Sequence, residues 1–434
     1  MQAYLVLLVL IMSYLALREG RWISVSAMTL FALLVLYGGG HVYYYYHSGL
    51  EDRVADRVTA VLVCMWIGLI VGVEVMRAAF AQASARRECL LRDWSNTPFV
   101  LSAGDAALWK LLALLLAVYL GAMFLLLGKG SQILSFLALD SELAKREFRL
   151  AVGTEGDYVF RLVLSVAAPM VALYMFVTAV ATRRPGDIAL AMGLCVLVFL
   201  FKVGSFHKAQ WVWFVVQLML AWRLARSPRA NLPWLLGGAV LFVAALLVGA
   251  QFAYPDLDVL GLWGYLTYRV FEITNEGLYQ FLYVYPEYIP HTYGMNVGLL
   301  HTFFGSGEFV AAHTRVAQFF GSFDGTHNAV FIADAWVDFA EAGVFATALV
   351  VGMVVKSIDL LAAQWGRTPA SIALLAYSFY GVITLCSTSA FTALLTGGLV
   401  SAPVLVLAVR GVARWIAAQP EVRQSVPRSL IQSQ

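Results

Sequence analysis

Charged residues are scarce in this chain of 434 residues: Asp, Glu, Lys and Arg together make up 13%, against about 25% in soluble globular proteins. Cysteine is also scarce, and three of the four cysteines lie inside apolar stretches, which argues against a disulfide scaffold. The sequence has no basic tract and no zinc-like Cys/His spacing, and its net charge of +3 gives no reason to expect a nucleic-acid partner. Hydrophobic residues make up 61% instead, which excludes a soluble enzyme and a disordered protein.

Long apolar stretches recur along the chain, and a helix needs roughly 20 apolar residues to cross the hydrocarbon core of a bilayer. Eleven such stretches predict an all-α polytopic membrane protein with about eleven transmembrane helices. They run near 3–17, 22–40, 58–76, 107–128, 158–181, 188–204, 208–225, 233–251, 329–356, 370–386 and 390–410. We therefore predict one integral membrane domain over residues 1–418 and a disordered cytoplasmic tail over 419–434.

The distribution of Lys and Arg outside these stretches predicts the orientation. The loops on the side of Arg18 and Arg21, together with the C-terminal tail, carry 17 of these residues, Lys356 among them, and the opposite side carries 10. The N-terminus is therefore expected outside and the C-terminus in the cytoplasm.

This orientation places the longest non-spanning segment, residues 252–328, outside the membrane. The segment holds 18 Phe, Tyr or Trp among 77 residues and four of the seven histidines. Because a structureless loop of this length is unusual, we expect short helices at the membrane surface. A charged run at 142–149 is typical of a second external, interfacial helix.

Charges inside or beside a bilayer need a partner or water. Glu74 and Arg77 lie three residues apart, which predicts a local ion pair. Arg161, one turn into the fifth stretch, is either an interfacial anchor or a cation of an external site.

A sharper signal is the external segment Phe201-Lys-Val-Gly-Ser-Phe-His-Lys208. Gly204 and Ser205 can break the helix there, which would expose backbone N–H groups beside Lys202, His207 and Lys208. This arrangement suits an anion such as a phosphate or diphosphate. The alternative is an ordinary turn with lysines that extend to the interface.

The external segment adds Tyr268-Arg269 and, further on, Glu276 and Tyr279. The guanidinium group of Arg269 matches the geometry of phosphate. Tyrosines with interleaved polar residues can bind sugars, or they can form the aromatic belt of a membrane interface.

Another candidate is Asp324-Gly-Thr-His327-Asn328, which leads directly into an apolar stretch. His327 can accept a proton near neutral pH or orient a hydroxyl group. The alternative is a capped helix start. Asp334, Asp338 and Glu341 follow at spacings that predict one helical face.

The order of these features resembles the bacterial O-antigen polymerases and the lipid A–core O-antigen ligases. Lys145-Arg-Glu-Phe-Arg149 ahead of Tyr158 and Arg161 is similar to the oligosaccharide repeat-unit polymerases. Thr326-His-Asn-Ala-Val-Phe331, followed by Asp338-Phe-Ala-Glu-Ala-Gly343, resembles the His-Asn motif of the ligases and the helix after it. Where that family has Ser-Gly-x-Arg-Gly, this chain has Gly204-Ser-Phe-His-Lys208.

The resemblance implies a glycosyltransferase of the bacterial inner membrane with a GT-C-like architecture and its active site on the periplasmic side. It would need no metal and no cofactor. A glycan on undecaprenyl diphosphate would be the donor, a hydroxyl of the next lipid-linked repeat unit the acceptor, and the anomeric centre would be inverted. Membrane lipids and a chain-length regulator are the further expected partners.

In such a reaction the protein positions two lipids and stabilises the negative charge of the diphosphate. The diphosphate-binding candidates are Lys202, His207, Lys208, Arg161 and Arg269. The candidate proton acceptors are His327, Glu276 and Asp324. The candidate sugar-binding residues are Asn328, Tyr268, Tyr279 and Asp338. A ligase using the same donor remains an alternative, and so does a transporter of lipid-linked oligosaccharides. A membrane O-acyltransferase is a weaker option.

Overall fold

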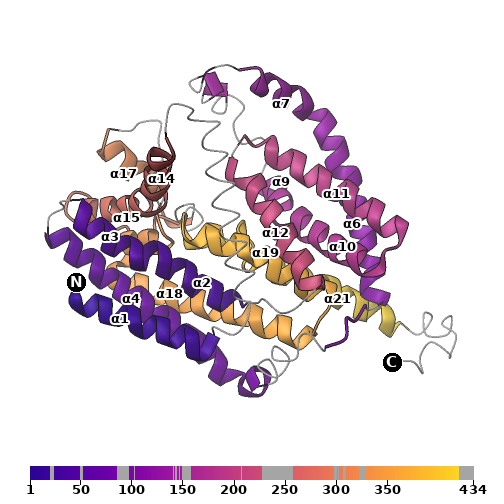
Figure 1. The fold of residues 1–434 in the computed structure, drawn as a ribbon, viewed down its shortest axis with the longest axis horizontal. Coiled ribbons are helices and arrows are strands. Elements are labelled where there is room, and N and C mark those ends of the chain that lie inside the picture. Colours follow the sequence, from indigo (N-terminus) through magenta and orange to yellow (C-terminus); the bar gives the residue numbers. More distant parts are fainter. Residues whose placement is uncertain are drawn as a thin grey trace. The chain divides into compact units, whose positions relative to one another are not determined.

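The structure is a computed structural model, and Figure 1 shows its fold. It describes residues 1–19, 24–48, 52–85, 97–101, 103–139, 141, 144–145, 147–148, 158–206, 208–226, 258–297, 301, 303–305, 309–321 and 329–419. Every regular element within these ranges is helical. The chain divides into two compact units. The first comprises Met1–Leu91, Arg229–Leu360 and Gly381–Ala393, and the second comprises Arg92–Pro228, Leu361–Tyr380 and Leu394–Gln434.

Seven helices in the described part are long and apolar enough to cross a membrane: Val25–His47, Asp52–Ala79, Gly104–Leu126, Tyr158–Thr182, Pro185–Val203, Ile332–Trp365 and Ser401–Ala418. Gln2–Arg18 and Pro369–Leu385 are shorter apolar helices. These helices confirm the prediction of an all-α polytopic membrane protein. A helix suits the bilayer because it satisfies its own backbone hydrogen bonds within lipid. The count of eleven spans stays a prediction.

Two of the predicted stretches differ from the rest. Residues 208–225 form α12 (Lys208–Arg226), which is not among the seven, and 233–251 lie outside the described residues. The expectation of one helix over 390–410 is wrong: α20 (Ala390–Leu395) ends before α21 (Ser401–Ala418) begins. Gly398 has a φ of +84° between them, and a Cβ there would lie 2.2 Å from the Tyr377 ring. The helix therefore breaks where only glycine fits.

The first unit is built around the contact of α4 (Asp52–Ala79) with α18 (Ile332–Trp365), which lie side by side in Figure 1. Gly68 and Gly72 of α4 form a small-xxx-small pattern that lets two helix backbones approach closely. A Cβ at Gly72 would lie 2.2 Å from the carbonyl oxygen of Leu349, and one at Gly352 would lie 2.4 Å from that of Leu69. The register of these contacts shows that the two helices run in the same direction.

Two further helices complete the inner part of the first unit. α1 (Gln2–Tyr14) packs on α4, where the Trp66 indole donates to the Tyr4 hydroxyl at 3.4 Å. α2 (Val25–Leu33) continues through the π-helical segment η2 (Leu34–Gly39) into α3 (Gly40–His47). The start of α2 is bound by Asp359 of α18, which accepts from the backbone N–H groups of Val25 at 2.7 Å and Ser26 at 3.2 Å.

The second unit packs four helices around apolar side chains: α6 (Ala103–Leu126), α10 (Ala168–Thr182), α11 (Pro185–Val203) and α12. Trp109 of α6 stacks on Tyr174 of α10 with ring centroids 4.4 Å apart. At the start of α11, Asp187 forms an ion pair with Lys110 at 2.6 Å. α7 (Lys129–Leu137) follows α6, and α19 (Pro369–Leu385) passes from this unit into the first.

The described part of the chain contains four π-helical segments, and such segments recur at functional sites. They are η1 (Leu15–Glu19), η2, η3 (Val163–Ala167) and η4 (Tyr268–Glu272). η3 follows α9 (Tyr158–Leu162) and ends two residues before Pro169, which has no N–H to donate. In the first unit, Asn275 donates from Nδ2 to the carbonyl oxygens of Leu36 in η2 and Phe271 in η4, at 2.9 and 2.7 Å.

The described parts of residues 252–328 contain short helices joined by turns. α14 (Val259–Thr267), η4 and α15 (Ile273–Val284) are consecutive, and α17 (Ala312–Phe319) follows later. The expectation of short helices is thus confirmed for these parts. Residues 144–145 and 147–148 of the charged run are helical, and the tail after Gln419 lies outside the described residues.

Two charged positions bear on the sequence predictions. The ion pair between Glu74 and Arg77 is confirmed, and the Tyr14 hydroxyl also donates to Glu74 at 2.6 Å. Lys356, by contrast, is not a loop residue: it lies within α18 with 0% of its side chain exposed, because α18 continues to Trp365. One of the 17 charges that predicted the orientation is therefore buried inside the protein.

Candidate functional site

The predicted site residues fall in both units. Arg269, Tyr268, Glu276, Tyr279 and Asp338 belong to the first unit, whereas Lys202 and Arg161 belong to the second. His207, Asp324, His327 and Asn328 lie outside the described residues, and for Lys208 only the backbone, at the start of α12, is described. Tyr268, Arg269, Glu276 and Tyr279 follow one another along a single continuous helical stretch, which η4 and α15 form.

Arg269 is an exposed arginine that its own helix holds in place. Its Nε donates to the Tyr265 hydroxyl at 3.0 Å, and its guanidinium carbon lies 5.3 Å from the centroid of the Tyr265 ring. Within the described part of the chain it forms no ion pair. The two terminal nitrogens are therefore available to an anion, while stacking on the ring reduces the rotamer freedom that binding would cost. Tyr268 beside it is 43% exposed.

Tyr279 lies in the interior and not at a sugar-binding surface. It is 2% exposed, and its hydroxyl lies 3.0 Å from His41 Nδ1. His41 Nε2 lies 2.9 Å from Thr59 Oγ1, which in turn donates to the carbonyl oxygen of Ala55 at 2.8 Å. Since Thr59 uses its only proton on Ala55, it accepts from His41 Nε2–H. In the tautomer that carries its proton on Nε2, Nδ1 accepts from the Tyr279 hydroxyl.

Glu276, a candidate proton acceptor, lies three residues before Tyr279 on α15. It is half-buried, and its Oε1 accepts from Gln280 Nε2 at 3.1 Å, one turn further along the same helix. This local bond satisfies part of its carboxylate. Glu276 therefore lies close to Tyr279 on the same helix, but its carboxylate already has a hydrogen-bond partner in Gln280.

Asp338 organises a loop. Its Oδ1 accepts from Thr292 Oγ1 at 2.5 Å and from the backbone N–H groups of Gly294 and Asn296 at 2.9 and 3.3 Å. Asp334, one turn earlier, accepts from Asn296 Nδ2 at 2.7 Å. With the side chain 5% exposed and Oδ1 bonded three times, Asp338 fixes residues 292–296 against α18.

The helix that carries these acids is interrupted directly after Asp338. Phe339 and Ala340 leave the helical conformation, and Ala340 has a φ of +51° with a ψ of −143°, a region normally restricted to glycine. The loop satisfies carbonyl groups at the break, because Thr292 N donates to Val337 O at 3.0 Å and Tyr293 N to Asp338 O at 3.1 Å. The prediction that Asp334, Asp338 and Glu341 share one helical face is therefore wrong, since the break separates Glu341 from the other two.

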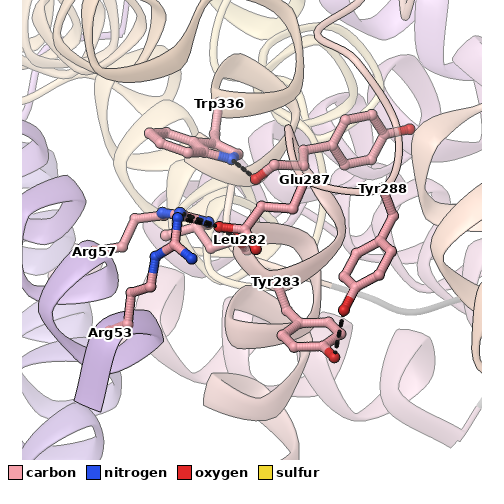
Figure 2. Close-up of polar contacts among 8 residues, drawn as sticks. Arg53, Arg57, Leu282, Tyr283, Glu287, Tyr288 and Trp336 are labelled. Carbon is pink, nitrogen blue, oxygen red and sulfur yellow. Dashed lines mark hydrogen bonds and ion pairs between the residues drawn. The ribbon is translucent and has the colours of Figure 1, made fainter. Parts of the chain in front are cut away.

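A charged cluster at the start of α4 was not singled out by the sequence (Figure 2). Arg53 and Arg57 both contact Glu287 Oε1, at 2.9 and 2.7 Å, and Arg57 also donates to the carbonyl oxygen of Leu282 at 2.7 Å. The two arginines hold the pKa of the Glu287 carboxyl below its usual value. Their spacing of four residues places both on one helical face, which is a signal that sequence reading had available. The partner, 230 residues away from Arg57, carried no such signal.

In the second unit, Lys202 is a buried cation at the end of a candidate span. Its side chain is 7% exposed, and its Nζ lies 5.4 Å from the centroid of the Tyr380 ring and 6.0 Å from that of Phe214. Among the described residues no carboxylate forms an ion pair with it. Lys129 is equally buried and donates to Gln132 Oε1 at 2.9 Å. Arg161 is exposed on α9.

The sequence matches no protein-family model and no curated protein, and the fold matches no solved structure. Among the described residues, no group of three or more His, Cys, Asp or Glu side chains is placed to hold a metal ion.

Proposed function

We propose that this protein is a membrane glycosyltransferase that polymerises a surface polysaccharide. It would transfer a growing glycan from a lipid diphosphate, of the undecaprenyl type, to a hydroxyl of the next lipid-linked repeat unit. The observation that carries the proposal is Arg269, whose guanidinium group is fixed on Tyr265 while its terminal nitrogens have no acidic partner among the described residues. A fixed, exposed guanidinium group is suited to a diphosphate group.

The chemistry supports the same choice. A diphosphate is already a good leaving group, so the protein has to position two lipid-linked substrates and stabilise negative charge as the bond to the diphosphate breaks. Arginine supplies this stabilisation without a metal. The polytopic helical fold provides access for substrates whose lipid tails stay in the bilayer.

The orientation belongs to the same proposal. With the N-terminus in the periplasm and the C-terminus in the cytoplasm, Arg269 and the helices α14 to α17 face the periplasm of a bacterial inner membrane. A lipid-linked repeat unit reaches this side after it has crossed the membrane. A ligase that passes the glycan to lipid A–core or a protein would use the same donor site, so the product distinguishes the two enzymes.

A transporter of lipid-linked oligosaccharides is the second candidate, and one observation favours it. The candidate span α18 is interrupted at Phe339 and Ala340, and interrupted helices are typical of transporter binding sites. Transporters commonly carry such interruptions in matching halves. Among the candidate spans in the described part of the chain, α18 is the one whose backbone leaves the helical conformation.

The test uses purified full-length protein in liposomes with a defined lipid-linked repeat unit. We expect a ladder of longer lipid-linked glycans. Arg269→Ala should lower the rate by about tenfold or more, the scale of a lost charged hydrogen bond, and Arg269→Lys should restore part of it. Arg53→Ala, which removes an exposed arginine of the same unit, is the matched control. Movement of a fluorescent lipid-linked sugar across the bilayer without any ladder would reject the enzyme and favour the transporter.

A further inference from the structure

Glu341 is a carboxylate that the structure leaves without a partner in the membrane-crossing part of the first unit. It lies in the candidate span Ile332–Trp365, is exposed, and forms no hydrogen bond or ion pair with any residue that the structure describes. The other described carboxylates of α18 contrast with it. Asp334 and Asp338 are bonded to the loop around Asn296, and Asp359 is bonded to the start of α2.

The depth of Glu341 follows from the helix beside it. The Gly68 and Gly72 contacts put Phe345 and Leu349 level with the middle of α4, and Glu341 lies close enough to Cys64 to affect it electrostatically. Cys64 is seven residues beyond Arg57 in a run, 58–73, that has no charged side chain. Seven residues of helix correspond to about 10 Å. Glu341 thus lies well inside the apolar level of α4.

A carboxylate at this depth is costly unless water or a ligand reaches it, so it indicates a functional site. The backbone next to it supports this reading. Ala340 is held in a left-handed conformation, and strain of this kind persists where the surrounding structure enforces it, often at functional sites. On one side of the break, the hydrogen bonds of Asp338 to the loop hold the backbone in place. On the other side, Gly343 packs closely on the preceding turn, because a Cβ there would lie 2.4 Å from the carbonyl oxygen of Ala335.

We propose that Glu341 is the proton acceptor for the acceptor hydroxyl in the transfer reaction, which the substrate approaches from within the membrane. This inference rests on the proposed function. The hydroxyl proton passes to a carboxylate oxygen of Glu341 while the hydroxyl oxygen forms a bond to the anomeric carbon of the donor glycan. The bond from that carbon to the diphosphate breaks, and its electron pair leaves with the lipid diphosphate.

The choice of Glu341 over the sequence candidate Glu276 follows from partners. Glu276 already accepts from Gln280 within its own helix, whereas Glu341 has both oxygens available among the described contacts. Glu341 acts electrostatically on Cys64 of α4, and Asp338 on its own helix is turned to the loop.

A labelling experiment tests the site without relying on activity. Dicyclohexylcarbodiimide is lipid-soluble and reacts with carboxyl groups in apolar surroundings. In liposomes containing the full chain, we expect it to modify Glu341, as located by peptide mass spectrometry. Labelling of this peptide should be lost in Glu341→Gln and retained in Glu74→Gln, which removes a carboxylate that is paired with Arg77 at the other end of α4. Failure to modify Glu341 would overturn the proposal.

An activity experiment tests the role. Glu341→Gln should lower the rate of glycan transfer by about 100-fold or more, within the range of general base catalysis, and Glu341→Asp should restore part of it. Wild-type activity that Glu341→Gln retains in full would reject this role and leave the proposed function standing. No transfer by the wild-type protein would reject the proposed function itself.

Discussion

The hydroxyl of Tyr279 lies 3.0 Å from Nδ1 of His41, which joins α15 to α3 in the interior of the first unit. Both side chains are almost completely buried. Tyr279→Phe would leave a buried acceptor nitrogen without a donor, at a cost of about 1–3 kcal/mol. We expect a lower unfolding temperature in detergent for this variant. Tyr288→Phe, which removes the hydroxyl of a 54% exposed tyrosine, is the control. Equal stability of the two variants would contradict the buried hydrogen bond. Loss of glycan binding without loss of stability would support the sequence prediction that Tyr279 binds sugar.

Gly72→Ala should disrupt the contact between α4 and α18. The added Cβ would lie 2.2 Å from the carbonyl oxygen of Leu349, a backbone atom that cannot move aside without separating the helices. We expect destabilisation by about 1–3 kcal/mol, the scale of overpacking. Gly104→Ala and Gly121→Ala in α6 are matched controls, since no atom lies within 4 Å of their added Cβ atoms. These controls should be neutral or stabilising by about 0.5–1 kcal/mol, and thermal unfolding in detergent measures all three.

Ala340→Gly should stabilise the protein. Ala340 has a φ of +51°, where a Cβ is unfavourable, and glycine removes that strain. A gain of about 1 kcal/mol is expected after the larger backbone entropy of the unfolded chain is included. Ala342→Gly, two residues further along α18, is the control and should instead destabilise by up to about 1 kcal/mol. A destabilised Ala340→Gly would show that the helix is not interrupted at this residue.

The ion pairs of Glu287 with Arg53 and Arg57 should make stability depend on pH. The pKa of the Glu287 carboxyl is below the ordinary value of 4.5 in the folded protein, so its contribution is fully present above pH 4.5. It is lost as pH falls below 4.5 and through the lowered value. We expect the unfolding temperature of the wild type to fall more steeply between pH 5 and pH 3 than that of Glu287→Gln. Parallel curves would contradict the ion pairs.

Lys202→Met separates packing from charge in the second unit. Methionine keeps most of the length and contacts of a side chain that lies against Phe214 and Tyr380, so the folded protein should be retained. If Lys202 binds the diphosphate, as the sequence predicts, transfer activity should fall by about tenfold or more. Lys129→Met is the matched control, because Lys129 is equally buried but has Gln132 as an acceptor. Full activity of Lys202→Met would leave Lys202 a structural cation.

The amino-acid sequence alone determined the class of fold and several local features. Apolar runs of membrane-crossing length dictate helices, because a backbone in lipid has to satisfy its own hydrogen bonds. The Glu74–Arg77 pair followed from spacing on one helix. The helices in the described part of residues 252–328 followed from the length and the aromatic content of that segment. Arg269 was singled out from its residue type and its place in the segment 252–328.

The tertiary structure decided which polar side chains are already satisfied, since those partners are distant in sequence. Tyr279 and His41 are 238 residues apart, and Asp338 bonds a loop 44 residues earlier at Gly294. Periodicity also could not show the break at Ala340, which left Glu341 grouped with Asp334 and Asp338. An interrupted helix depends on neighbours: the loop at Thr292 satisfies the carbonyls that the break exposes, and Gly343 admits the close approach to Ala335. Contacts between distant segments therefore separate the satisfied carboxylates of α18 from Glu341.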